Sequence, residues 1–145
     1  VAVTTEFQDT IAFVGTVKGH IIKVTVKSGQ MATSYEDMTV EDGSKIYADM
    51  FFDSDRRHLY ALTDRKIYKL KVQECMQYAT CKSCLGANDP FCGWCSLQNK
   101  CSQREECERH EQELRWLSSG HLYHYHTCCA RQDTERTSKK PHSCS

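Results

Sequence analysis

The chain has 145 residues, enough for one ordinary domain or two small ones. Its 19 basic and 19 acidic residues balance, which argues against the broad positive surface of a nucleic-acid-binding protein. No apolar run approaches the roughly 20 residues that cross a bilayer, so direct membrane insertion is not expected. All ten cysteines lie at or after Cys75. This change in composition predicts a domain boundary near residue 73.

The region before the cysteines is predicted to be β-structure. Apolar and polar side chains alternate strictly in residues 22–27 (IKVTVK), which indicates a strand with one buried face. Residues 11–15 (IAFVG) precede it across a Lys18-Gly19 turn, so the two segments are predicted to form a hairpin. Further strands are expected at residues 50–52, 58–62 and 66–72.

Short strands at this spacing, without helices between them, are typical of a sandwich, a barrel or propeller blades. A propeller blade uses four strands in roughly 40–45 residues. The β region would therefore supply about one and a half blades, and we expect it to be part of a larger propeller.

A different pattern begins after Val72. Thr80 is a predicted N-cap for a short helical turn that carries Cys81 and Cys84. Residues 102–105 (SQRE) have the spacing of a capping box, which predicts a solvated helix that continues to Leu114. Residues 130–145 contain very few apolar side chains and are predicted to be disordered.

The cysteines of segment 81–95 (CKSCLGANDPFCGWC) could bind zinc, form a redox-active dithiol or belong to a structural disulfide framework. Zinc ribbons commonly separate their C-x-x-C pairs by 15–20 residues, whereas only seven residues lie between Cys84 and Cys92. The histidines that could support zinc binding lie on a weakly patterned tail: His121, His124 and His126. A redox dithiol at Cys92 and Cys95 would be expected after a strand of a βαβ unit, and no such pattern surrounds it.

A disulfide framework is the third interpretation and explains the most cysteines. Seven of them fall between Cys75 and Cys107, a region too small to be stabilised by a hydrophobic core alone. Because seven is odd, one partner must lie outside this cluster, and Cys128 or Cys129 is the nearest candidate. We therefore favour structural disulfides.

The spacing C-x5-C-x2-C-x7-C-x2-C-x5-C-x5-C of residues 75–107 resembles the PSI domain shared by plexins, semaphorins and integrins. The most characteristic residues are Tyr78, Asp89-Pro90 and the segment 92–95 (CGWC), in which Gly93 is most similar to the plexin version. Residues 10–24 and 51–75 resemble the last strands of a plexin sema domain, a seven-bladed propeller that runs directly into PSI.

This resemblance implies a mostly β fold, with partial sema-type β-propeller blades in residues 1–73 and a small disulfide-rich PSI domain in residues 74–129. It also implies a set of disulfides: Cys75–Cys92, Cys84–Cys101, Cys95–Cys107, and Cys81 with a downstream cysteine, Cys128 or its neighbour Cys129. The structural core is expected to comprise Trp94, Gly93, Pro90 and Tyr78.

The functional expectation that follows is an extracellular fragment of a plexin-like semaphorin receptor. In such a receptor the propeller binds a semaphorin and PSI orients the propeller, while a homodimer or co-receptor belongs to the full protein. The chain is expected on the extracellular side of the plasma membrane, without an anchor of its own. No nucleophile–base–orienter set is present, so no catalytic, cofactor or metal site is predicted.

Two alternatives stay open. One is a semaphorin ligand or growth-factor-receptor relative that carries the same two modules. The other is a small secreted thiol–disulfide oxidoreductase that uses Cys92 and Cys95.

Overall fold

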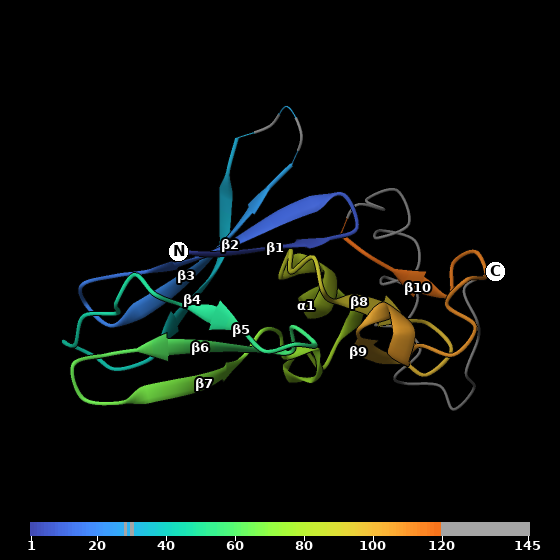
Figure 1. Cartoon of the computed structure of the whole chain (residues 1–145). Coiled ribbons are helices and arrows are strands. Elements are labelled where there is room, and N and C mark those ends of the chain that lie inside the picture. The colour runs from blue at the N-terminus through green and yellow to red at the C-terminus, as the bar shows by residue number, and fades with distance from the viewer. Residues whose placement is uncertain (28, 30, 120–145) are drawn as a thin grey trace. The chain divides into compact units, whose positions relative to one another are not determined.

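The computed structural model describes residues 1–27, 29 and 31–119 (Figure 1). The chain divides into two compact units, Val1–Gln73 and a cysteine-rich unit that begins at Glu74. Strands dominate both, and the helical segments are short, so the mostly β class is confirmed. The expectations for residues 130–145, for Cys128 and Cys129, and for the three histidines at 121–126 lie outside the described residues.

The first unit begins with a four-stranded antiparallel sheet. It contains β1 (Ala2–Glu6), β2 (Asp9–Gly15), β3 (His20–Val26) and β4 (Thr33–Thr39), in that order. The predicted hairpin corresponds to β2 and β3. Sequence patterning missed β4 because its residues (TSYEDMT) are mostly polar and lack a clear apolar alternation. It also missed β1, which ends before the predicted β region begins.

A three-stranded antiparallel sheet follows in the same unit. It contains β5 (Phe51–Phe52), β6 (His58–Leu62) and β7 (Ile67–Lys71), again in chain order. These strands coincide with the three segments that the sequence predicts, to within one or two residues at each end.

The two sheets repeat one side-chain pattern. Phe13 on β2 pairs across the strands with Lys23 on β3, and Tyr60 on β6 pairs in the same way with Lys69 on β7. In each pair the lysine Nζ lies over the aromatic ring, 5.7 Å from the Phe13 centroid and 5.8 Å from the Tyr60 centroid. The two sheets are therefore successive copies of one structural repeat.

The turns that close the two hairpins repeat as well. The Thr16 hydroxyl accepts a hydrogen bond from the His20 N–H at 3.0 Å, and the Thr63 hydroxyl accepts one from the Lys66 N–H at 3.3 Å. The repeats lie about 45 residues apart, which is the length of a propeller blade. This periodicity favours propeller blades over the sandwich and barrel alternatives.

The core of the first unit lies between the two sheets. Ile11 and Phe13 on β2 and Leu59 on β6 are completely buried. Phe13 meets Phe52 edge to face, with ring centroids 5.5 Å apart. Burying a large apolar side chain contributes roughly 1.5–3 kcal/mol, so this contact holds the sheets together.

Lys23 is buried within this apolar contact. Its side chain is 2% exposed, its Nζ donates a 2.8 Å hydrogen bond to the Val72 carbonyl, and the same atom lies 2.7 Å from Glu36 Oε2. The alternation in residues 22–27 predicted the opposite face of β3 as the buried one. That prediction is wrong: Ile21, Lys23 and Thr25 are buried, while Val26 is 38% exposed. A lysine can occupy the core here because both of its contacts satisfy the charge.

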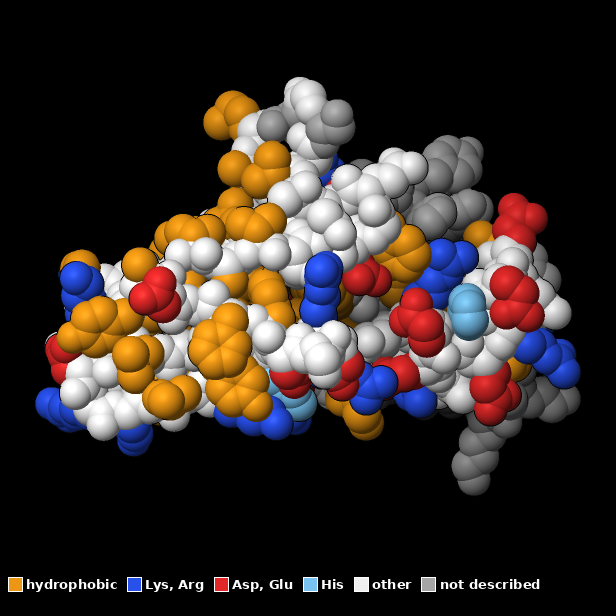
Figure 2. Space-filling model, viewed as in Figure 1, with side chains coloured by type: hydrophobic (Ala, Val, Ile, Leu, Met, Phe, Trp, Pro, Cys, Tyr) orange, Lys and Arg blue, Asp and Glu red, His pale blue; other side chains and the backbone are white. Residues whose placement is uncertain are grey.

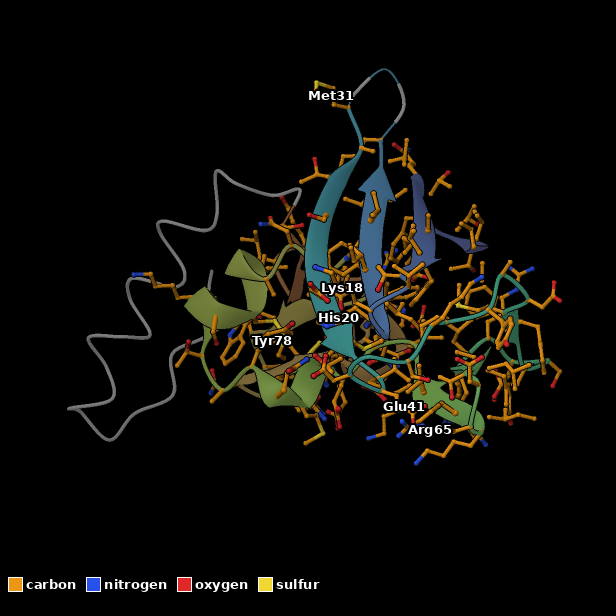
Figure 3. All side chains as sticks on the ribbon, turned by 90° about the vertical axis from the view of Figure 1, so that its left-hand side faces the viewer. Lys18, His20, Met31, Glu41, Arg65 and Tyr78 are labelled. Carbon is orange, nitrogen blue, oxygen red and sulfur yellow. A yellow bond between two sulfur atoms is a disulfide. The ribbon has the colours of Figure 1, made fainter. Side chains whose placement is uncertain are left out.

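The segment that connects the sheets contacts both hairpin turns. Gly19 has φ +88°, and a Cβ at this position would lie 1.7 Å from the Glu41 carbonyl oxygen, so the turn requires glycine. The Glu41 carboxylate accepts a 2.6 Å hydrogen bond from the Thr63 hydroxyl, which lowers the pKa of this carboxyl group. Arg65 lies 3.7 Å away at the same end of the unit (Figure 3).

The second unit contains a small three-stranded sheet and short helical turns. The strands are β8 (Gly93–Cys95), β9 (Lys100–Ser102) and β10 (Trp116–Leu117), in the order β10-β8-β9. They are accompanied by the 3-10 turns η1 (Cys75–Gln77) and η2 (Arg104–Glu106) and by the helix α1 (Cys81–Gly86). Thr80 caps α1 by accepting a hydrogen bond from the Ser83 N–H at 3.1 Å, as the sequence predicts.

The helix predicted to continue to Leu114 is not formed. The structure places the cap at Gln103 with Glu106, one residue later than predicted, and the helical geometry ends after the single turn η2. The left-handed conformations at Arg109 and Leu114 are incompatible with a continuous helix. The disulfide at Cys107 holds this segment in a sequence of turns instead.

Replacing Lys23 by methionine tests the buried ion pair. The Lys23→Met variant retains the aliphatic stem but leaves the Val72 carbonyl and the Glu36 carboxylate without their cation. We expect the free energy of unfolding to fall by about 1–3 kcal/mol. Urea unfolding should be followed by far-UV circular dichroism, because both tryptophans lie in the second unit. The exposed Lys18→Met is the control, and equal stability of the two variants would contradict the assignment.

Candidate functional site

Disulfides connect the elements of the second unit. Cys75 on η1 is bonded to Cys92, which directly precedes β8, with the Cα atoms 5.4 Å apart. Cys84 on α1 is bonded to Cys101 on β9, with a Cα separation of 5.7 Å. Cys95 on β8 is bonded to Cys107 after η2, with a Cα separation of 5.5 Å. Cys81 is disulfide-bonded as well.

Trp94 lies at the centre of the cluster that these bridges enclose. It is 4% exposed and pairs with Cys101 on one side and Leu117 on the other. Its neighbours in the core are mostly half-cystines, together with Leu85 and Leu117. The indole Nε1 has no hydrogen-bond partner among the described residues. Trp94 stabilises this core by packing against these neighbours.

Gly93 allows a second tryptophan to approach the sheet. A Cβ at this position would lie 2.3 Å from the Trp116 ring and 2.6 Å from the Leu117 carbonyl oxygen. Trp116 in turn donates from Nε1 to the Ser102 carbonyl at 3.1 Å. Any side chain at position 93 would displace Trp116, so glycine is required by space at this position.

The other predicted core residues lie at the edge of the cluster. Tyr78 is half-buried and packs against the core, and it is labelled in Figure 3. Pro90 is half-buried in the turn before β8. In this turn the buried Asp89 accepts hydrogen bonds from the Phe91 N–H through Oδ1 and from the Cys92 N–H through its carbonyl.

Cys92 and Cys95 do not form the dithiol that an oxidoreductase would need. They are bonded to different partners, Cys75 and Cys107, and are 2% and 0% exposed. A catalytic pair needs an accessible thiolate on one cysteine and a disulfide between the two. This geometry contradicts the oxidoreductase alternative.

A group of potential metal ligands that the sequence reasoning missed lies in the first unit, in the turn between β5 and β6. Ligand atoms of Asp53, Asp55 and His58 lie within 4.8 Å of one another. Asp53 accepts a hydrogen bond from the His58 N–H at 2.9 Å and one at 2.8 Å between Oδ2 and His58 Nδ1. The backbone hydrogen bond is the main cause that lowers the pKa of Asp53 to about 2. These hydrogen bonds explain why Asp53 and His58 lie close together: they stabilise the tight turn between β5 and β6.

The only sequence signal for this group is the spacing Asp-x-Asp-x-x-His. Such spacing is common in turns, because an Asp side chain can accept hydrogen bonds from the backbone a few residues later.

In the part of the chain that the structure describes, no helix is long and apolar enough to span a membrane.

Comparison with known proteins gives a consistent picture. Residues 74–129 match the family model described as PSI, the plexin repeat. The chain is 43% identical to Plexin A3 of Danio rerio over 118 residues and 39% identical to Plexin-B2 of Mus musculus over 119 residues. These matches cover 79% and 82% of this chain, and the chain spans about 6% of each of these curated relatives.

Solved structures show the same relationship. The extracellular region of Plexin A4 (domains 1 to 8) superposes with a TM-score of 0.70 at 37% identity, covering 76% of this chain and 11% of that one. Drosophila Semaphorin 1b (extracellular domains 1-2) shares the fold, with a TM-score of 0.68 at 17% identity, covering 81% of this chain and 26% of that one. By sequence and by fold, this chain is similar to a segment of the plexin extracellular region, and its residues 74–129 match the plexin-repeat family model.

Proposed function

We propose that this chain forms part of an extracellular, non-catalytic semaphorin receptor. The observation that carries the proposal is the order of the two units: propeller-type sheets run directly into a disulfide-bonded plexin repeat. One of the matching solved structures is described as Drosophila Plexin A in complex with Semaphorin 1b. Because the chain is 39–43% identical to plexins and that structure holds a plexin with a semaphorin, semaphorin is the ligand class that we assign to the complete receptor, in which a homodimer or co-receptor would also take part.

We assign different roles to the two units. The first unit contributes sheets to the propeller that binds the ligand, and the second is a rigid support that orients the propeller. Rigidity is favoured by the density of cross-links, because three bridges tie η1, α1, β8 and β9 together with the segment after η2. Each bridge typically contributes about 2–4 kcal/mol. Disulfides of this kind persist in oxidising compartments, which supports a location on the extracellular side of the plasma membrane.

The alternative of a semaphorin ligand with the same modules is less well supported. Identity is 37–43% to plexins such as Plexin A4 and Plexin A3, and 17% to Semaphorin 1b. A match at the lower level shows only the fold. The higher identity favours the receptor side of the pair.

A receptor chimera tests the proposal. The matching segment of mouse Plexin-A3 is replaced by residues 1–129 of this chain, which keep the plexin-repeat match whole, and binding of a semaphorin that recognises the parental receptor is measured on cells. We expect the chimera to reach the cell surface and to bind the semaphorin, because both units of this chain should replace the corresponding parts of the plexin. A chimera that reaches the surface and does not bind the semaphorin would contradict the assignment. The chain by itself is expected not to bind, because it supplies only two sheets of the propeller.

Trp94 is expected to be essential for the support role. Trp94→Ala should lower the free energy of unfolding of the second unit by about 3–5 kcal/mol, as in other buried large aromatics. Trp94→Phe is the matched variant: it keeps most of the packing and removes an indole N–H that has no partner among the described residues, so the loss should be smaller. Thermal unfolding followed by tryptophan fluorescence of Trp116 measures both. Equal stability of the alanine variant and the parent would refute a core role.

Peptide mapping under non-reducing conditions tests the disulfide framework. The secreted chain is alkylated without reduction, digested and analysed by mass spectrometry. We expect Cys92 to be recovered linked to Cys75 and Cys95 linked to Cys107, with no alkylation of these four thiols. A peptide with Cys92 bonded to Cys95 would restore the oxidoreductase alternative.

A further inference from the structure

The chain leaves the first unit at Val72, and this residue is anchored by its side chain and by both of its backbone groups. It directly follows β7, its side chain is buried, with only 1% of the residue exposed, and its N–H donates to the Arg57 carbonyl at 2.9 Å. Its carbonyl accepts the 2.8 Å hydrogen bond from Lys23 Nζ. The last position of the first unit's second sheet is therefore fixed by packing and by two hydrogen bonds.

The second unit is anchored almost immediately afterwards. Glu74 precedes η1, and its carbonyl accepts a 3.3 Å hydrogen bond from the last N–H of that turn. The next residue, Cys75, is 3% exposed and is bonded to Cys92. Only Gln73 lies between Val72 and Glu74. Because three residues of extended chain span at most about 10–11 Å, the connection between the two anchors is short.

A short connection limits the motion of two joined units in a way that does not depend on their surfaces. Joined compact units move relative to each other by default, unless the surface between them is large and hydrophobic. On the side seen in Figure 2, the cysteine-rich unit presents charged side chains of both signs. A connection of one residue leaves few rotatable bonds, and it stays that short only while Val72 remains bonded.

Lys23 is the contact that keeps the Val72 carbonyl in place. It comes from β3 of the neighbouring sheet, 49 residues away in the sequence, and its side chain is 2% exposed. The end of a strand can fray, because its last backbone groups have few partners. A charged donor makes a hydrogen bond roughly twice as strong as a neutral one, so the ammonium group opposes fraying. Glu36 Oε2, 2.7 Å from Nζ, compensates the buried charge.

We propose that Lys23 is a positioning residue for the second unit. By holding the Val72 carbonyl, it keeps the flexible connection at one residue and so limits the directions in which the second unit can point. Loss of this hydrogen bond frees the end of β7 and lengthens the connection. The inference rests on the proposed function, because a support that orients the propeller needs a fixed connection to it.

Distances between the two units of the complete chain test this role. Spin labels are introduced as noncanonical amino acids, which leave the cysteines unchanged, at Val17 (71% exposed) and at the exposed Lys82 on α1. Pulsed electron paramagnetic resonance then measures the distribution of the distance between the labels. We expect a narrow distribution for the parent chain. In Lys23→Met the flexible connection grows from one residue to about four, so the width should rise about twofold, as the square root of that number.

Two matched variants separate positioning from a general loss of stability. Ala61→Gly destabilises the same strands, because Ala61 is 1% exposed and pairs with Tyr68, nearer the other end of β6 and β7. This variant should keep the narrow distribution. Lys23→Arg retains a cationic donor and should give a narrower distribution than Lys23→Met. Far-UV circular dichroism checks that each variant is folded.

Two further measurements guard against a variant that does not fold. If Lys23→Met fails to fold, Lys23→Met with Glu36→Gln takes its place, because the second change removes the charge that the first leaves unpaired. A Gly-Gly insertion between Gln73 and Glu74 lengthens the connection while Lys23 stays in place, and it should broaden the distribution. Hydrogen exchange should be faster at the Val72 amide in Lys23→Met and unchanged at the Tyr68 amide.

Several outcomes would overturn the proposal. A broad distribution for the parent chain, or an equally narrow one for Lys23→Met, shows that this lysine does not limit the motion. A distribution as broad for Ala61→Gly as for Lys23→Met shows an effect of stability alone. A narrow distribution after the Gly-Gly insertion shows that the connection does not set the direction. Semaphorin binding by the chimera tests the receptor role separately, and a chimera that fails to bind leaves the distance results unchanged.

Discussion

The packing of one sheet face against another is the contact on which the first unit depends. Phe13 and Ile11 supply the apolar area, and Lys23 adds a buried polar link, a hydrogen bond to the carbonyl of Val72, which directly follows β7. A buried ammonium group is costly unless it is paired, so this link requires the two sheets to be in correct register. The same lysine that could destabilise an apolar core thus helps to specify how the sheets pack.

The second unit is stabilised mainly by disulfides, whereas the first is stabilised by the packing of two sheets. Its strands are only two or three residues long, and their core consists largely of half-cystines around Trp94 and Leu117. Short strands make few ladder hydrogen bonds, so the bridges supply constraints that the sheet cannot. Gly93 completes the arrangement by leaving space for the Trp116 ring. Consequently, the second unit is expected to depend on oxidising conditions, whereas the first contains no cysteine.

The repeat within the first unit links fold and function. Two sheets with the same aromatic–lysine pair form a stack with an outer face on each side, and such a stack can be extended at both ends by further sheets of the same kind. The similarity to plexins gives this arrangement a biological context, since those relatives are far longer than this chain. A propeller is completed when every such face is covered, and the outer faces of this chain have the composition that this requires.

Residue patterns along the chain were enough to predict the strands β2, β3, β6 and β7, the cap of α1 and the position at which the cysteines begin. These features depend on local alternation, local hydrogen bonding and residue spacing, all of which can be read from consecutive residues. The buried face of β3 could not be predicted in this way, because Lys23 is stabilised by Glu36 and Val72, which lie far away in the sequence. The helix predicted to continue to Leu114 failed for a similar reason, since the Cys95–Cys107 bridge constrains the segment from outside. The cysteine spacing favoured structural disulfides over zinc and dithiol roles, and the tertiary structure supplied the partners, bonding Cys92 to Cys75 and Cys95 to Cys107.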